Sequence, residues 1–178
     1  MELDRLRFPI GHFEPITNPT SEQRTAIIQQ ISAFAKDLRE LVSACSPQQL
    51  QTPYRPGGWC IQQIIHHMAD NDMNAYIRFK RALTEREPMS GTYREDLWAE
   101  MCDYKDAPIE LSLTLLEALH GRFLILLQGS KPEDFKRTLR TEVLGTITLE
   151  IALQRFIWHN RHHMTQISTL IDSMSKGT

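Results

Sequence analysis

The chain has 178 residues, of which 41% are hydrophobic and 24% charged, and its formal net charge is -2. These values are typical of one soluble globular domain spanning residues 1–178, and they exclude global disorder. A net charge this small provides no basic surface for nucleic acid or anionic lipid. We therefore expect no nucleic-acid partner and no membrane partner.

The cysteines and the N-terminal sequence indicate the compartment. The three cysteines, Cys45, Cys60 and Cys102, are scattered and form no C-x-x-C pair, which favours a reducing compartment over a disulfide framework. The first residues lack the basic start and apolar run of a secretory signal, and no segment has the roughly 18 apolar residues of a transmembrane helix. We expect a cytoplasmic protein.

The first predicted helix begins at Thr20. Thr20 and Gln23 have the spacing of a capping box directly after Pro19, and the helix is expected to end at Ser46-Pro47. Its apolar residues recur at alternating steps of four and three, which is the pattern of one helix face. They are Ile27, Ile31, Phe34, Leu38, Leu41 and Cys45.

Three further segments have helical periodicity. The second helix is expected to start near Cys60 and to end before Pro88. The third opens after Asp106-Ala107-Pro108, where the aspartate is predicted to be the N-cap, and ends before Gly129. The fourth starts near Thr148 and continues to the C-terminus. Four amphipathic helices predict an all-α four-helix bundle.

The segments between these helices refine the prediction. Two connections of about 20 residues are long for a bundle of neighbouring antiparallel helices, and they permit a crossover along its length. Residues 139–147 alternate around Gly145, which predicts a small hairpin between the third and fourth helices. Residues 1–19 contain three prolines, so we expect an extended arm packed across the bundle.

Five of the seven histidines lie in two tight clusters on predicted helices. His159 and His163 are four residues apart and continue the apolar line of the fourth helix, so both imidazoles can reach one metal ion. His162 points about 100° away from His163 and is a weaker candidate. On the second helix, His67 is preferred over the neighbouring His66, which is also turned by about 100°.

His67 heads a polar stripe that borders the apolar line of the second helix. Asn71, Asn74 and Arg78 follow it at steps of four, three and four, so this stripe is expected to face the bundle interior. Asp72 falls on the apolar line itself, where a carboxylate needs an ion pair or hydrogen bonds. The pattern predicts one divalent metal ion per chain, held by three histidines: His67, His159 and His163.

The alternative is that these histidines are structural and satisfied by hydrogen bonds. That interpretation is preferred for single histidines such as His120, which lies on the buried side of the third helix between Leu116 and Phe123. His120 is expected to be hydrogen-bonded or to support a ligand rather than to bind metal. His12, in the arm, receives no role.

Three neutral imidazoles typically leave an open position for water or substrate, as in catalytic zinc sites. Zinc and nickel both suit imidazole ligands. Water at the open position can become a nucleophile for hydrolysis, and a thiol there can attack an electrophile. The candidate catalytic or substrate-orienting residues are Asp72, Asn74 and Arg78. No G-x-S-x-G, glycine-rich phosphate loop or H-E-x-x-H motif is present.

Several stretches, in order along almost the whole chain, resemble the DinB-like four-helix-bundle superfamily. Within it, the chain is similar to the YfiT branch, whose members are described as metal-dependent hydrolases. The matching stretches are Phe8-Pro9-Ile10-Gly11, residues 50–55, Gly57-Gly58-Trp59, His66-His67-Met68-Ala69-Asp70, residues 73–80, Leu119-His120-Gly121-Arg122, Trp158-His159 and His162-His163.

This resemblance implies an up-down-down-up bundle, a homodimer, and a nickel or zinc ion held by His67, His159 and His163. The sequence departs from the family pattern at His12, where an acidic residue is usual, and at Asp72, where a histidine is expected. Other branches resemble thiol S-transferases that use bacillithiol or mycothiol, or isomerases. We expect a small-molecule substrate and hydrolysis. The alternatives are thiol S-transfer with a low-molecular-weight thiol, and a non-catalytic bundle that binds a metal or ligand.

Overall fold

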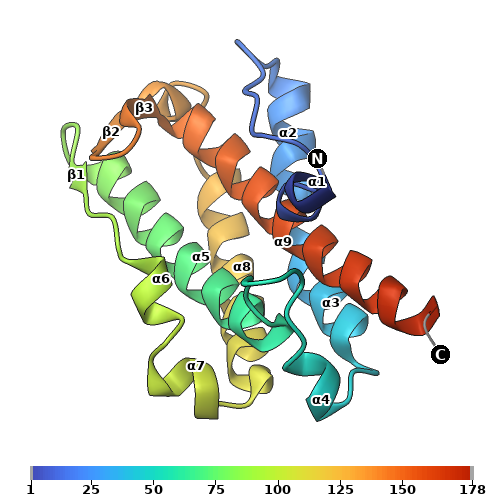
Figure 1. Cartoon of the computed structure of the whole chain (residues 1–178). Helices are drawn as coiled ribbons and strands as arrows, with labels where there is room; N and C mark the ends of the chain where they lie inside the picture. Colours follow the sequence, from blue (N-terminus) through green and yellow to red (C-terminus); the bar gives the residue numbers. More distant parts are fainter. Residues whose placement is uncertain (1, 177–178) are drawn as a thin grey trace.

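Four long helical segments dominate the chain in the computed structural model, which describes residues 2–176 (Figure 1). Met1 of the predicted arm and residues 177–178 lie outside this range. The long segments are α2 (Ser21–Gln29) with α3 (Ile31–Val42), α5 (Ile61–Thr84), α8 (Ile109–Gln128) and α9 (Leu149–Lys176). The short helices are α1 (Glu2–Arg7), α4 (Pro47–Leu50), α6 (Glu95–Trp98), α7 (Cys102–Asp106) and η1 (Asp134–Lys136). The predicted all-α four-helix bundle is confirmed.

The order of helix directions is up-down-down-up. The first turn of α9 lies beside α2, where Arg24 Nε and Glu150 Oε2 are 2.5 Å apart. The C-terminal end of α5 lies at the same end of the bundle, because Arg137 Nε donates to the Ala82 carbonyl at 2.6 Å. Figure 1 shows α5 and α8 running toward this end, and α2–α3 and α9 running away from it. The connection from α5 to α8 returns along the bundle through α6 and α7, which is the predicted crossover.

Three details of the predicted helices need correction. The first helix ends at Val42, before the predicted end at Ser46-Pro47. The first helix has the predicted capping box at Thr20, but it is interrupted at Gln30, whose backbone N–H bonds to the Ile27 carbonyl in a tighter turn. Asp106 is not the N-cap of α8; it is the last residue of α7, and Pro108 is the N-cap. Ala107 is extended, because the residue before a proline is disfavoured in the helical region.

The N-terminal arm is only partly extended. Residues 2–7 form α1, and the three prolines of the arm all lie after this helix, so nothing in this stretch prevents helix formation. The prediction that the arm packs across the bundle is confirmed by two contacts with α9. Gln166 Nε2 donates to the Arg7 carbonyl at 2.9 Å, and Ile16 N donates to Gln154 Oε1 at 2.7 Å.

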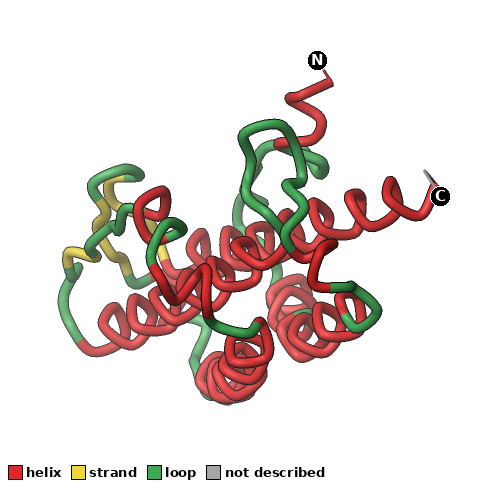
Figure 2. Tube along the Cα trace, turned by 60° about the horizontal axis from the view of Figure 1, so that its bottom comes forward, coloured by secondary structure: helices red, strands yellow, loops and turns green. Residues whose placement is uncertain are grey.

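The predicted hairpin is present at one end of the bundle (Figure 2). Strands β2 (Thr138–Thr141) and β3 (Gly145–Thr148) pair antiparallel, and Gly145 adopts a φ of 65° that glycine accommodates without strain. A two-residue strand, β1 (Met89–Ser90), pairs parallel with β2 and completes the sheet order β1-β2-β3. This strand was not predicted, because two residues show no periodicity.

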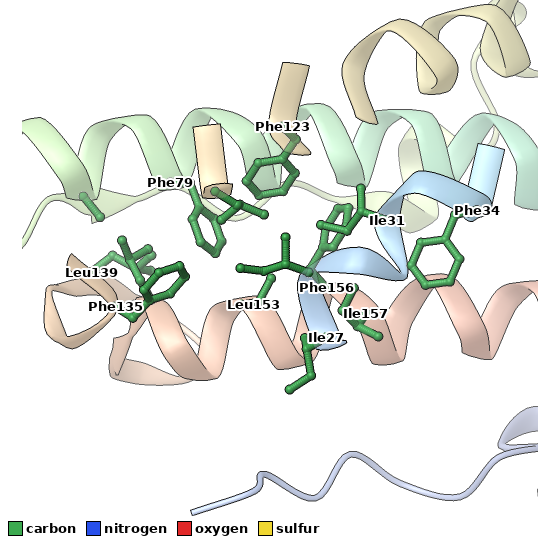
Figure 3. Close-up of a cluster of buried hydrophobic side chains, with 14 residues drawn as sticks. Ile27, Ile31, Phe34, Phe79, Phe123, Phe135, Leu139, Leu153, Phe156 and Ile157 are labelled. Atoms are coloured by element: carbon green, nitrogen blue, oxygen red, sulfur yellow. The ribbon is translucent and has the colours of Figure 1, made fainter. Parts of the chain in front are cut away.

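The core consists of two apolar clusters with a polar layer between them. The cluster near the hairpin is built around Phe79, Phe123 and Phe156, whose ring centroids lie 4.9 and 5.0 Å apart along that series (Figure 3). The second cluster packs the opposite half of the bundle, where Leu38 and Ile65 are fully buried. Between the clusters lie the buried polar side chains His67, Asp72, His120, Asn160, His163 and Gln166. No helix among residues 2–176 is long and apolar enough to cross a membrane.

Candidate metal centre

Three imidazole nitrogens converge in the polar layer. His67 Nε2 on α5 lies 3.0 Å from His159 Nε2 on α9, and His163 Nε2 lies 3.2 Å from the same atom. All three lie within 4.8 Å of one another. Two nitrogens bound to one tetrahedral zinc ion are roughly 3.3 Å apart, since each bond is about 2.0–2.1 Å long. The cluster therefore fits a divalent ion with a small outward movement of the rings.

The orientation of His163 is fixed by Gln166. His163 Nδ1 donates to Gln166 Oε1 at 2.8 Å, while Gln166 Nε2 donates to the Arg7 carbonyl at 2.9 Å. Because a backbone carbonyl accepts only, the Gln166 amide must present its oxygen to His163. His163 therefore carries its proton on Nδ1 and directs the lone pair of Nε2 into the cluster. The N-terminal arm takes part in this arrangement through Arg7.

The proton of His159 is placed differently. Asn71 Nδ2 lies 3.1 Å from His159 Nδ1 and 3.2 Å from Asp72 Oδ1, so the amide donates to both. His159 then carries its proton on Nε2, between the neighbouring imidazoles. To bind a metal through Nε2, His159 must move this proton to Nδ1, where the Asn71 oxygen can accept after the amide rotates.

The three histidines are neutral at neutral pH. Burial lowers the pKa of His67 to about 4, with a smaller contribution from His162. Burial, followed by the repulsion of neighbouring imidazoles, also lowers the pKa of His159 and His163 well below the usual value. Neutral imidazoles have the free lone pairs that a metal requires. His67 Nδ1 is buried without a hydrogen-bond partner among the described residues.

Aromatic residues from two connecting segments cover His67. The Trp59 ring centroid lies 4.7 Å from that of His67, and the Tyr93 ring centroid lies 6.5 Å away. Burial raises the pKa of Tyr93, so its phenol remains a neutral donor. The Tyr93 hydroxyl has no partner within the described part of the chain. Sequence reasoning missed Tyr93, because no periodic pattern connects it to the helices.

Asp72 lies at the centre of a buried hydrogen-bond network. Its carboxylate is 0% exposed and accepts from His120 Nε2 at 2.7 Å and from Asn160 Nδ2 at 3.1 Å. Through Asn71, this network reaches His159. The prediction that Asp72 requires hydrogen bonds is confirmed. His120 supports the centre through Asp72 and lies outside the three-histidine cluster.

The remaining histidines have other contacts. His66 Nδ1 lies 2.7 Å from Ser112 Oγ, and burial lowers the pKa of His66. His162 stacks on Trp158 with ring centroids 4.8 Å apart, and burial lowers its pKa to about 4. The ring of His12 lies 4.1 Å from that of Phe8 in the arm. These contacts explain the three histidines without a metal.

A cleft of about 190 Å³ opens beside the cluster, between α5, α9 and the hairpin. Of the candidate substrate-orienting residues, Arg78 lines the cleft and donates to the Gly91 carbonyl at 2.9 Å. Asn74 instead donates to the Asp70 carbonyl one turn earlier, and Asp72 is fully buried. The cleft is lined by Asn71, Ala75, Arg78, Phe79, Leu139, Thr141, Leu144, Ile147, Ala152, Arg155, Phe156, Trp158 and His159.

The arrangement suits chemistry on a small molecule. His159 belongs both to the three-histidine cluster and to the lining of the cleft, so a ligand in the cleft lies next to the candidate metal position. No carboxylate belongs to the cluster among the described residues, so three neutral donors would leave the ion its full positive charge. Arg155, missed in the sequence, lies one helical turn before His159 and lines the same cleft.

Known proteins share this fold closely. YfiT from Bacillus subtilis, whose structure is described as that of "a probable metal-dependent hydrolase with an unusual four-helix bundle topology", superposes with a TM-score of 0.93 at 40% identity. The match covers 96% of this chain and 98% of YfiT. TT2238, a four-helix bundle protein, has a TM-score of 0.59 and 18% identity, and it supports the fold alone.

Sequence comparison gives the same assignment. A Bacillus cereus protein named "Putative metal-dependent hydrolase" is 40% identical over 168 residues, covering 94% of this chain and 96% of the relative. A Bacillus mycoides protein of the same description is 38% identical over 170 residues, covering 96% and 98%. The model of the DinB superfamily matches residues 30–167. By these matches and by its fold, the chain belongs to the DinB superfamily.

Proposed function

We propose that this chain is a metal-dependent hydrolase that holds one zinc or nickel ion through His67, His159 and His163. The observation that carries this proposal is the convergence of three neutral imidazoles beside a cleft. The Nε2 atom of His159 lies 3.0 Å from that of His67 and 3.2 Å from that of His163. It is supported by relatives about 40% identical that are named as metal-dependent hydrolases. The substrate is proposed to be a small molecule, because the cleft is small.

A divalent ion held by three imidazoles polarises a carbonyl group and lowers the pKa of water, which are the requirements of hydrolysis at neutral pH. The residues of the chain have separate tasks around this chemistry. Gln166 orients His163, and Asn71 orients His159. Asp72 contacts Asn71 and His120 and does not line the cleft, so its proposed role is positioning.

Arg78 is proposed to orient the substrate, because among the candidates on α5 it is the charged side chain that lines the cleft. Trp59 and Tyr93 cover His67 and limit the access of bulk water to the cluster. Exclusion of water strengthens the electrostatic interactions of a charged site.

The metal site can be tested by elemental analysis of the untagged protein. We expect about one zinc or nickel ion per chain in the wild type, and loss of this ion in His67→Ala, His159→Ala and His163→Ala. The exposed His12 provides a matched control, since His12→Ala should keep the metal. Circular dichroism must show that each variant remains helical. A folded wild-type protein that takes up neither ion would overturn the proposal.

The reaction can be tested with a panel of esters, amides and lactones. Zinc- or nickel-loaded protein is expected to hydrolyse at least one class, and His159→Ala is expected to abolish the activity. The same preparations should be assayed for transfer of a low-molecular-weight thiol to 1-chloro-2,4-dinitrobenzene. Thiol transfer without hydrolysis across the panel would replace hydrolysis with S-transfer as the assigned reaction.

A further inference from the structure

The cleft beside the cluster is positively charged and contains no acidic side chain. Arg78 from α5 and Arg155 from α9 both line it, and its lining includes no aspartate or glutamate. The formal charge of the cleft lining therefore comes from two guanidinium groups.

Neither arginine is paired with a carboxylate within residues 2–176. Arg78 donates to the backbone carbonyl of Gly91, and the guanidinium of Arg155 lies 4.8 Å from the ring centroid of Phe13. By contrast, Arg24 and Arg39 each form an ion pair with a glutamate. Both cleft arginines are half-buried, and arginine stays protonated in such surroundings. An anionic ligand would supply the missing charge and offset the cost of desolvating them.

The rest of the cleft is mostly apolar. Phe79 and Phe156, both labelled in the apolar cluster of Figure 3, provide aromatic surface. The volume of about 190 Å³ is below the roughly 300–1,000 Å³ of pockets for drug-sized ligands. The remaining apolar side chains are Ala75, Leu139, Leu144, Ile147 and Ala152. A ligand that fits has a short apolar body and one anionic group.

We propose that the substrate is a small organic carboxylate whose anionic group is bound by Arg78 and Arg155. Its apolar body lies on Phe79 and Phe156, and its reactive group faces His159. Guanidinium groups bind carboxylates through planar, two-point hydrogen bonds, and the small volume of the cleft favours this compact anion over a phosphate. The assignment of the bound molecule as a substrate rests on the proposed hydrolase function, whereas the binding of the anion does not.

The test compares hexanoate with hexanamide, which has the same shape without the charge. Both are titrated into the full-length protein of known metal content, and binding is followed by amide chemical shifts. We expect hexanoate to bind about tenfold more tightly, as charge-assisted hydrogen bonds predict. The largest shifts are expected at Ala75 and Ala152, which line the cleft.

Arginine variants locate the anion. Arg78→Gln and Arg155→Gln are each expected to weaken hexanoate binding about tenfold and to leave hexanamide binding unchanged. Arg155→Lys keeps the charge but loses the planar two-point hydrogen bonding, so it should retain only part of the preference. Arg161→Gln changes an exposed arginine on the same helix, outside the cleft, and should have no effect. Hexanoate binding that survives both glutamine substitutions would refute the proposal and indicate that the anion binds elsewhere.

The outcome is independent of the metal. His67→Ala should lose the ion and still prefer hexanoate, because His67 does not line the cleft. If the wild-type protein binds no metal but shows the arginine-dependent preference for hexanoate, the anion site is supported and the hydrolase function is rejected. If the protein binds metal but has equal affinity for hexanoate and hexanamide, the anion site is rejected and the proposed hydrolase function is unaffected.

Discussion

Replacing Asp72 with asparagine changes one acceptor in the centre of the bundle and almost nothing in shape. The carboxylate is fully buried and accepts hydrogen bonds from His120, Asn160 and Asn71 at 2.7, 3.1 and 3.2 Å. Asparagine keeps one acceptor oxygen and introduces an amide donor. With the new amide nitrogen toward Asn160 and Asn71, N–H groups face one another. With it toward His120, the imidazole must move its proton to Nδ1, which has no partner among the described residues. Either way, a buried N–H is left without an acceptor.

The expected cost follows from this count. A buried donor without a partner costs about 1–3 kcal/mol, and more when a charged partner is lost. We therefore expect Asp72→Asn to lower the free energy of unfolding by about 3 kcal/mol. Since 1 kcal/mol shifts Tm by about 2–4 °C in a domain of this size, Tm should fall by about 6–12 °C. Urea denaturation and thermal unfolding of metal-free protein measure both quantities.

A matched control is available on α9. Asp172 is exposed, so Asp172→Asn should change stability by no more than about 0.5 kcal/mol. The same Asp72→Asn variant should bind zinc about 10- to 100-fold more weakly in a chelator competition, because residues that orient ligands have effects of this size. Loss of less than 1 kcal/mol together with unchanged zinc affinity would show that the network does not hold the site.

Three further predictions concern the site and the hairpin. Because the folded-state pKa of His67 is about 4, below the usual 6.5, the unfolded chain binds more protons between these values. The stability that neutral His67 contributes to the metal-free protein is therefore complete above pH 6.5. It is lost as pH falls toward 4, which lowers the free energy of unfolding by up to about 3 kcal/mol. Urea denaturation at pH 7 and 4.5 should show this loss, and the loss should be smaller in His67→Gln. Asn71→Ala should weaken zinc binding about tenfold in chelator competition, because His159 loses its partner; unchanged affinity would contradict this role. Gly145→Ala, at a φ of 65°, should lower stability by about 1 kcal/mol in urea denaturation and leave metal content unchanged.

The helices and the histidine cluster could be predicted because both depend on one period. Residues four apart on a helix share a face, so His159 and His163 were expected to act together. The polar stripe headed by His67 bordered the apolar line of its helix, and the structure places His67 against His159 and His163. The choice of His67 over His66 agrees with the contacts, since His66 faces Ser112 on α8.

Features that depend on distant parts of the chain could not be predicted. Arg155 differs little from other surface arginines in the sequence, and only the approach of the hairpin to α5 and α9 makes it part of a cleft. The helices α4, α6 and α7 have four or five residues, which is too short to show a helical period. The interruption at Gln30 has no glycine or proline to indicate it.

The position of the polar layer would link the proposed metal ion to the stability of the fold. It separates two apolar clusters, and within it the cluster of Nε2 atoms has three lone-pair positions but one proton, on His159, to share among them. A divalent ion accepts all three lone pairs at once, which the shared proton cannot do. The unfolded chain offers no preformed site, so binding free energy is added to folding free energy. With the proposed ion bound, this layer would link α5 to α9.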